Sequence, residues 1–283
     1  MTRRPTVFIT GATSGLGRAL ATEFAVRGWH VAVHGRDDAK LAGVAAELER
    51  DGATVTTSKA DITEPAQVRR AAERLRAELT VLDVVVNNAA VGGGVDPTRR
   101  EVNSQGTESR MAGNLLAPFV FNRALSGLLH RSDRGGRIVN VASIGQAPID
   151  VDDLDFHRDY DGVTAYCRSK LALIMDTVDL SAALAPAGTT VNAVHPAHLM
   201  PTNMLRDSGF TPEATIDDGV LPVLRAVLDT ELGGVTGRFL DRFTVARPHP
   251  QAEDPGVRHR LARWAADRVG DVEMFTPELT ASR

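Results

Sequence analysis

The feature that most restricts the fold of this chain is a regular alternation of strand-like and helix-like segments over its first two thirds. Short β-branched or apolar runs are each followed by a stretch of helical periodicity. The pattern predicts strands at 6–10, 30–34, 54–59, 81–86, 137–142 and 190–194, and helices at 16–26, 38–50, 65–79, 110–130 and 164–184. Such repeated strand–helix–strand units predict a Rossmann-type, doubly wound parallel sheet with helices on both faces, a three-layer α/β/α fold.

The last third of the chain has a weaker pattern. Residues 211–213 (Thr-Pro-Glu) are typical of an N-cap followed by proline at the first helical position, and apolar residues at helical spacing follow from 216 to 228. We expect a final edge strand at 237–240, a C-terminal helix at 257–269 and fraying over 271–283. No repeat or low-complexity linker divides the chain. The sequence therefore predicts a single domain over residues 1–283, with a C-terminal extension from about residue 241.

Composition excludes several classes of protein. The 283 residues are 43% hydrophobic and 24% charged, the balance of a globular protein with a large core. The net charge of −4 gives no reason to expect a nucleic acid or membrane partner, and no apolar run reaches the roughly 18–20 residues that span a bilayer. A single cysteine, Cys167, fits a reducing compartment, so we expect a cytoplasmic protein. The many arginines and alanines, against three lysines, suggest a bacterial source.

A glycine cluster follows the first predicted strand. Residues 10–17 read Thr-Gly-Ala-Thr-Ser-Gly-Leu-Gly and lie between a strand and a helix. Glycines there permit a tight turn and let backbone amides approach a pyrophosphate at the positive end of the helix. The spacing differs from the commoner Gly-x-Gly-x-x-Gly fingerprint, and such clusters also occur for steric reasons alone. The cluster by itself indicates dinucleotide binding without proving it.

A second motif places Tyr166 and Lys170 four residues apart on a predicted helix. This spacing puts both side chains on one helical face. A tyrosine has a pKa near 10, and a neighbouring cation favours its phenolate, which brings the group closer to the range useful for acid–base catalysis. The alternative is an amphipathic helix with a core tyrosine and a lysine that extends to solvent.

Together these motifs resemble the short-chain dehydrogenase/reductase family, and further matches follow in the family's order. They are Asp61-Ile62 after the third strand, Asn87-Asn88-Ala89-Ala90 after the fourth, Asn114 in the next helix, Ser143 after the fifth strand, His195-Pro196-Ala197 after the sixth, and Thr202. Ala90 and Ala197 replace glycines of the family pattern, which puts loop geometry in doubt. The insertion between Ser143 and Tyr166 and the tail from 237 onwards are similar to the retinol-dehydrogenase-like group. The acidic residues of that insertion, 150–155, also suit a solvated loop.

The resemblance implies a set of roles. Tyr166 would exchange a proton with the substrate oxygen, Lys170 would lower the pKa of Tyr166 and bind the nicotinamide ribose, and Ser143 would hydrogen-bond the substrate oxygen. Asn114 would hold a water in a proton relay that ends at Lys170. The cofactor would supply the hydride. The implied cofactor contacts are Gly11, Ser14, Gly15, Leu16, Gly17, Arg36, Asp61, Ile62, Asn88, Ala89, Tyr166, Lys170, Pro196 and Thr202.

The end of the second strand bears on cofactor choice. An acidic residue there binds the ribose 2′-OH of NAD, whereas an arginine accommodates the 2′-phosphate of NADP. The strand is followed by Gly35 and Arg36, which favours NADP(H) over NAD(H), although Asp37 comes next and Arg36 also suits a solvated loop. No metal is expected, because His195 and His198 have no carboxylate or cysteine placed beside them in the sequence.

The sequence does not name the substrate. We expect a medium-sized, partly apolar carbonyl or alcohol compound, bound by loops at about 92–110, 145–163 and 197–211. Two rival functions are a redox-silent NADP-binding regulator and an epimerase or dehydratase with the same Tyr–Lys pair. The family often pairs through the helices that here hold Asn114 and Tyr166, which would give a homodimer or homotetramer, unless the C-terminal extension covers those faces.

Overall fold

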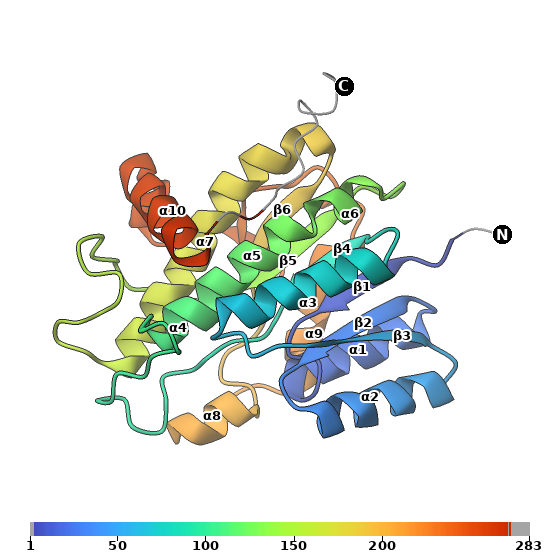
Figure 1. The fold of residues 1–283 in the computed structure, drawn as a ribbon, viewed down its shortest axis with the longest axis horizontal. Helices are drawn as coiled ribbons and strands as arrows, with labels where there is room; N and C mark the ends of the chain where they lie inside the picture. Colours follow the sequence, from blue (N-terminus) through green and yellow to red (C-terminus); the bar gives the residue numbers. More distant parts are fainter. Residues whose placement is uncertain (1–2, 271, 273–283) are drawn as a thin grey trace.

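The structure, a computed structural model, describes residues 3–270 and 272 and contains one eight-stranded sheet of order β3-β2-β1-β4-β5-β6-β7-β8 (Figure 1). Neighbouring strands are parallel from β3 to β7, and β8 runs antiparallel to β7. The strands are β1 Thr6–Ile9, β2 His30–Gly35, β3 Thr54–Lys59, β4 Val84–Asn87, β5 Arg137–Val141, β6 Thr190–His195, β7 Phe239–Asp241 and β8 Thr244–Ala246. The predicted Rossmann-type sheet is confirmed.

Helices cover both faces of this sheet. They are α1 Gly15–Val26, α2 Asp38–Arg50, α3 Pro65–Glu78, α4 Ser109–Met111, η1 Ala112–Leu116, α5 Ala117–Ala124, α6 Ser126–His130, α7 Gly162–Leu184, η2 Ala185–Ala187, α8 Asn203–Ser208, α9 Ile216–Leu228, η3 Pro250–Glu253 and α10 Pro255–Val269. Side chains of a strand alternate between the faces. Phe8 therefore packs in the core with α3, α5 and α7, whereas Val7 and Ile9 pack in the core with α1, α2 and α9.

The predicted helix at 110–130 is broken into four parts. Between α4 and α5 the chain makes a wider π turn, η1, which contains Asn114. Pro118 has no N–H to donate to the Asn114 carbonyl four residues earlier, so a regular α-helix cannot continue through this point. Single π turns inside helices occur frequently at functional sites. The sequence pattern alone did not predict this interruption.

The C-terminal third differs from the prediction in three places. The cap of α9 is Thr215, which forms a capping box with Asp218, so the predicted start at Thr211 is wrong. Thr202 caps the short helix α8, which was not predicted. The strand predicted at 237–240 begins at Phe239 and is not the edge of the sheet, because β8 pairs outside it.

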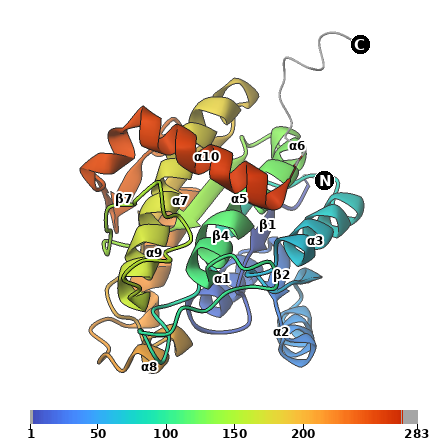
Figure 2. The same cartoon turned by 60° about the vertical axis from the view of Figure 1, so that its left-hand side comes forward.

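The C-terminal helix α10 lies across α7 and the region of η1 and α5 (Figure 2). Its cap is Asp254, whose carboxylate accepts hydrogen bonds from the amides of Gly256 and Val257. The fraying expected for 271–283 concerns residues that, apart from Val272, lie outside the described part of the chain. Within the described residues no helix is both long and apolar enough to cross a membrane.

Candidate active site

The predicted site residues gather at the carboxyl ends of the central strands, where open α/β sheets bind their ligands. The glycine loop follows β1, Asn88 and Ala89 follow β4, and Ser143 follows β5. Tyr166 and Lys170 reach this edge from α7, the helix between β5 and β6. The order of the strands, with β1 beside β4 and β4 beside β5, therefore brings these segments together.

The glycine loop is tightly packed. Gly11 and Gly15 have positive φ angles of 67° and 53°, which side chains rarely adopt. A Cβ on Gly17 would lie 2.3 Å from the carbonyl oxygen of Gly11. Ser14 is the N-cap of α1 and forms no side-chain capping bond, which suits an anion at this helix end. The loop thus fits a dinucleotide pyrophosphate.

Thr10 joins the glycine loop to the loop after β4. Its Oγ1 accepts hydrogen bonds from the backbone amides of Asn88 (2.9 Å) and Ala89 (3.0 Å). The Asn88 side chain returns a bond from Nδ2 to the Thr10 carbonyl, at 2.9 Å. Thr10 is part of the glycine motif, but the sequence alone does not indicate its role. Its hydroxyl fixes the relative position of two loops that the resemblance assigns to the cofactor.

The three candidate catalytic groups lie at the end of β5. The Tyr166 phenol is hydrogen-bonded to Ser143. The Lys170 ammonium lies 5.7 Å from the centre of the Tyr166 ring and donates a 2.7 Å hydrogen bond to the Val141 carbonyl. The Ser143 Oγ also accepts a bond from the Gly145 amide, at 3.0 Å. A substrate oxygen beside the Ser143 hydroxyl would therefore also be beside the Tyr166 phenol.

Burial controls the ionisation of this group. Burial raises the pKa of Tyr166 to about 12, and the hydrogen bond with Ser143 lowers this pKa by a smaller amount. Burial also lowers the pKa of Lys170 to about 7. The lowering of the pKa of Tyr166 by Lys170, which the resemblance implies for the enzyme with its cofactor, stays a prediction. Because desolvation disfavours both charged forms, it outweighs the attraction between them here.

Asn114 connects the loop after β4 with α7. Its Nδ2 donates to the Val91 carbonyl and to Ser169 Oγ, both at 2.9 Å, and its Oδ1 accepts from the Val91 amide at 2.7 Å. Ser169 in turn donates to the backbone carbonyl of Tyr166, at 2.7 Å. Asn114 thus holds Tyr166 in place through Ser169. The proton relay to Lys170 stays a prediction.

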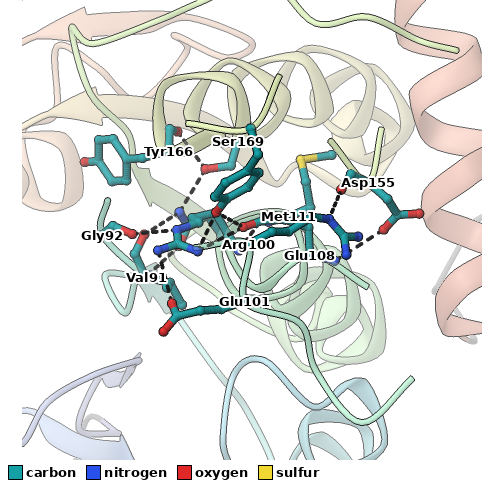
Figure 3. A network of polar contacts seen from close by, with 12 residues as sticks. Val91, Gly92, Arg100, Glu101, Glu108, Met111, Asp155, Tyr166 and Ser169 are labelled. Carbon is teal, nitrogen blue, oxygen red and sulfur yellow. Dashed lines mark hydrogen bonds and ion pairs between the residues drawn. The ribbon is translucent and has the colours of Figure 1, made fainter. Parts of the chain in front are cut away.

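A buried ionic network joins two of the three predicted substrate loops, 92–110 and 145–163 (Figure 3). Arg110 and Glu108 are fully buried and paired, with 3.1 Å between Arg110 Nη1 and Glu108 Oε1. Arg110 also donates to the Tyr160 hydroxyl (2.7 Å) and to the Gly92 carbonyl (2.8 Å), and the Tyr160 hydroxyl donates to Glu108 (3.0 Å). The pKa of Tyr160 is raised, first by burial and then by the Glu108 charge. Sequence reasoning missed this network, because no local motif marks it.

The remaining predicted cofactor residues lie on several different elements. Asp61 is fixed by hydrogen bonds from the amide (2.9 Å) and hydroxyl (2.8 Å) of Thr63. Ile62 packs against Gly113, and the Thr202 methyl group lies 3.2 Å from the Cβ that Gly15 would carry. Leu16 is the second residue of α1, and Pro196 follows β6 directly. Arg36 is exposed at the end of β2.

His195, the last residue of β6, and His198 do not form a metal cluster with other residues of the described part of the chain, where no three histidine, cysteine, aspartate or glutamate side chains gather to hold an ion. The ring centres of His195 and His198 are 6.5 Å apart. Glu213, distant in the sequence, lies 3.8 Å from His198 Nε2. Burial lowers the pKa of His195 to about 4, so its imidazole is neutral at physiological pH.

The fold and this constellation are those of a known family. The family model "short chain dehydrogenase" matches residues 5–211, and the chain belongs to the short-chain dehydrogenase/reductase family, oxidoreductases that act on CH–OH or C=O groups. Within the family it is retinol-dehydrogenase-like. It is 31% identical over 287 residues to "Retinol dehydrogenase 13" of Mus musculus, covering 94% of this chain and 84% of the relative.

Two further comparisons extend this result. The chain is 35% identical over 279 residues to "Putative daunorubicin C-13 ketoreductase DnrU" of Streptomyces sp. (strain C5), covering 94% of this chain and 93% of the relative. Among solved structures, a short chain dehydrogenase from Escherichia coli CFT073 complexed with NADPH superposes with a TM-score of 0.68. That structure is 25% identical, and the match covers 85% of this chain and 97% of the other.

Proposed function

We propose that this protein reduces a ketone or aldehyde group of a medium-sized, partly apolar substrate with NADPH, or oxidises the corresponding alcohol with NADP⁺. The observation that carries the proposal is the placement of Ser143, Tyr166 and Lys170 at the end of β5, beside the glycine loop. A redox-silent regulator has no need of this set of groups. An epimerase or dehydratase keeps the Tyr–Lys pair, but the C-terminal third here adds strands and helices to the main sheet instead of a separate substrate domain.

The chain's own residues would act on the substrate oxygen. NADPH supplies the hydride when it is bound. Tyr166 donates its proton to the carbonyl oxygen, and the Ser143 hydroxyl hydrogen-bonds the same oxygen as negative charge develops on it. Lys170, whose Nζ lies 5.7 Å from the centre of the Tyr166 ring, would hold the ribose hydroxyls and would be charged in that more polar surrounding. Its ammonium would then favour loss of the phenol proton.

Two features support NADP(H) over NAD(H). Arg36 is exposed at the end of β2 and forms no ion pair with any described residue, so its guanidinium is available to a 2′-phosphate. Asp37 caps α2 by accepting a 3.0 Å hydrogen bond from the Lys40 amide. Because Asp37 serves the helix, it is a poorer partner for a ribose 2′-OH. Solved relatives complexed with NADP and NADPH agree with this preference.

The surroundings of the site support a partly apolar substrate. Exposed apolar side chains occur on all three predicted substrate loops, at Val95, Val163 and Phe210, and Ile144 follows Ser143. An open hollow of about 400 Å³ adjoins the loop after β5; it is lined by Ile144, Gln146 and residues of 239–249, and none of Ser143, Tyr166 and Lys170 lines it. The names of the relatives, a retinol dehydrogenase and a daunorubicin ketoreductase, also refer to bulky compounds with apolar parts.

The test is to mix the protein with NADPH and each of a panel of ketones and aldehydes, and to measure the fall in NADPH absorbance. Oxidation of NADPH by the wild-type protein with at least one carbonyl compound is expected. General acid–base catalysis typically contributes about 10²- to 10⁴-fold, so Tyr166→Phe should lose most of the turnover and still bind NADPH. A Tyr166→Phe protein with more than about a tenth of the wild-type rate contradicts the assignment.

We also propose a cytoplasmic location, which fits the single cysteine.

A further inference from the structure

His34 lies beneath the glycine loop in an unusual setting. It is the second-last residue of β2 and only 2% exposed. The rings of Phe8 and Phe121 contact it edge-on, with centres 6.2 and 5.6 Å away. The Nε2 atom of its ring is buried without a hydrogen bond of ordinary length among the described residues, although the backbone of Ala60 lies near enough to offset part of the lowering of the ring's pKa by burial. A buried polar ring costs stability unless its nitrogens are hydrogen-bonded, so the contacts of the other nitrogen matter.

The other nitrogen, Nδ1, holds the loop. The Gly11 amide donates a 3.2 Å hydrogen bond to it, and the next amide, of Ala12, donates to the His34 carbonyl at 2.8 Å. Thr10, one residue earlier, still bonds to Val86 in the sheet. The positive φ of Gly11 turns the chain out of the sheet at this point. The two amides that follow the turn are thus both held by His34, on the neighbouring strand.

The ring must be neutral to do this. Nδ1 accepts a hydrogen bond only while it carries no proton of its own, so the ring proton is on Nε2. In a protonated ring Nδ1 would carry a proton, and this N–H would face the Gly11 N–H with no acceptor between them. Burial lowers the pKa of His34 to about 4, which keeps Nδ1 free to accept at neutral pH.

We propose that His34 is a positioning residue for dinucleotide binding, which holds Gly11 in its left-handed conformation before the cofactor arrives. The inference rests on the proposed function, because it assumes that the glycine loop binds NADP(H). Its structural basis is that His34 directly precedes Gly35, the last residue of β2, and lies two positions before Arg36. A Cβ on Gly35 would lie 2.6 Å from the Thr13 methyl group, so the loop also packs directly on this strand end. His34 therefore fixes the position of the glycine loop relative to Gly35 and Arg36, where the ribose phosphate of NADP(H) would bind.

Two substitutions separate positioning from packing. His34→Phe keeps an aromatic ring between Phe8 and Phe121 but removes the acceptor. His34→Asn can place an oxygen close to the position of Nδ1. We expect His34→Phe to raise the Kd for NADPH about tenfold, equivalent to about 1.4 kcal/mol, with a midpoint of thermal unfolding equal to or above that of the wild type. We expect His34→Asn to keep the Kd within about threefold of the wild type.

The measurements are NADPH titration by fluorescence, thermal unfolding without cofactor, and amide hydrogen exchange of the segment 10–17. An unchanged Kd in His34→Phe overturns the inference, as does an equal loss of affinity in both variants. Failure of the wild-type protein to bind NADPH would instead refute the proposed function. In that case amide hydrogen exchange still tests whether His34 holds the glycine loop. His34→Phe should speed the exchange of residues 10–17, and His34→Asn should not.

Discussion

At the scale of single residues, the site differs from a simple catalytic motif in its desolvation. Tyr166 and Lys170 are both shifted by burial toward their neutral forms, with pKa values of about 12 and about 7. The pair is therefore ready for acid–base catalysis only when a ligand with its own charges and hydroxyls enters the site and stabilises the charged form of Lys170. Motif spacing predicts that the two groups are neighbours, but it does not predict how much water surrounds them.

Arg36 gives a test of cofactor choice at the same scale. A guanidinium bound to a phosphate forms charge-assisted hydrogen bonds worth roughly 1.5–3 kcal/mol, so Arg36→Ala should raise the Kd for NADPH by about 10- to 150-fold. Because Arg36 is exposed, screening by salt favours the lower end of that range. The Kd for NADH should barely change. Titration of both cofactors gives the result, with Lys40→Ala as a matched exposed control. Equal weakening of both cofactors would contradict a phosphate contact.

Buried neutral histidines give a pH dependence of stability. Burial lowers the pKa of His195 from 6.5 to about 4, so below pH 6.5 the unfolded chain binds a proton that the folded one does not. Stability is therefore complete above about pH 6.5 and falls as the pH drops toward 4, by about 1.4 kcal/mol per pH unit for this histidine. Urea unfolding at pH 7 and pH 5 should show a smaller loss for His195→Asn than for the wild type. The same loss in both would show that His195 is not responsible.

At the scale of elements, the loops around the site are held by a buried ion pair in addition to apolar side chains such as Leu154 and Phe156, which lie in the hydrophobic core. Glu108 caps α4, Arg110 reaches back to the loop after β4, and Tyr160 belongs to the loop before α7. Asp155, in that same loop, accepts a hydrogen bond from the Glu108 amide and pairs with Arg268 of α10. Movement of one loop would therefore disturb the others.

Arg110→Met should destabilise the protein by about 3–5 kcal/mol, because it leaves the fully buried Glu108 carboxylate without its partner. Tyr160→Phe should cost only about 1 kcal/mol, since the ion pair survives. Adding Glu108→Gln to Arg110→Met should recover part of the loss. Urea unfolding of the three proteins measures these differences. A loss below about 1 kcal/mol in Arg110→Met would mean that the Tyr160 hydroxyl and the two backbone amides that also bind Glu108 are sufficient for its carboxylate.

The contrast between predicted and missed features has a physical reason. The glycine loop and the Tyr166–Lys170 pair lie within single turns of chain, so spacing alone predicts them. The bond between Asn114 and Ser169 joins residues that are 55 positions apart, and its existence depends on the π turn before Pro118. The cap of α9 was misplaced for a related reason. Both Thr211 and Thr215 are suitable caps, and only Thr215 has the aspartate three residues later.

At the scale of the whole molecule, the C-terminal extension covers faces through which the family often pairs. Leu261 and Ala265 of α10 are buried in the core that α5 and α7 share, and Arg258 bonds to Asp179 of α7 at 2.7 Å. β8 pairs along the outer side of β7. We propose on this basis that the protein is a monomer, against the homodimer or homotetramer that the resemblance alone suggests.

Light scattering after size exclusion should give a mass near 30.3 kDa at micromolar concentration. Leu261→Asp should release α10 from α7 and shift the protein toward larger species, because it exposes the apolar surface that α10 covers. Arg263→Asp, on the exposed side of the same helix, is the control and should stay monomeric. A dimeric wild-type protein would show that pairing uses another surface.

The position of α10 also bears on behaviour at dilution. An enzyme whose site is completed or stabilised by a neighbouring copy loses specific activity when its concentration falls below the dissociation constant of the pair. Here the helix that packs over α7, the helix of Tyr166 and Lys170, is part of the same chain. Packing against these catalytic elements is therefore an intramolecular contact. The turnover of each molecule should be the same at nanomolar as at micromolar protein.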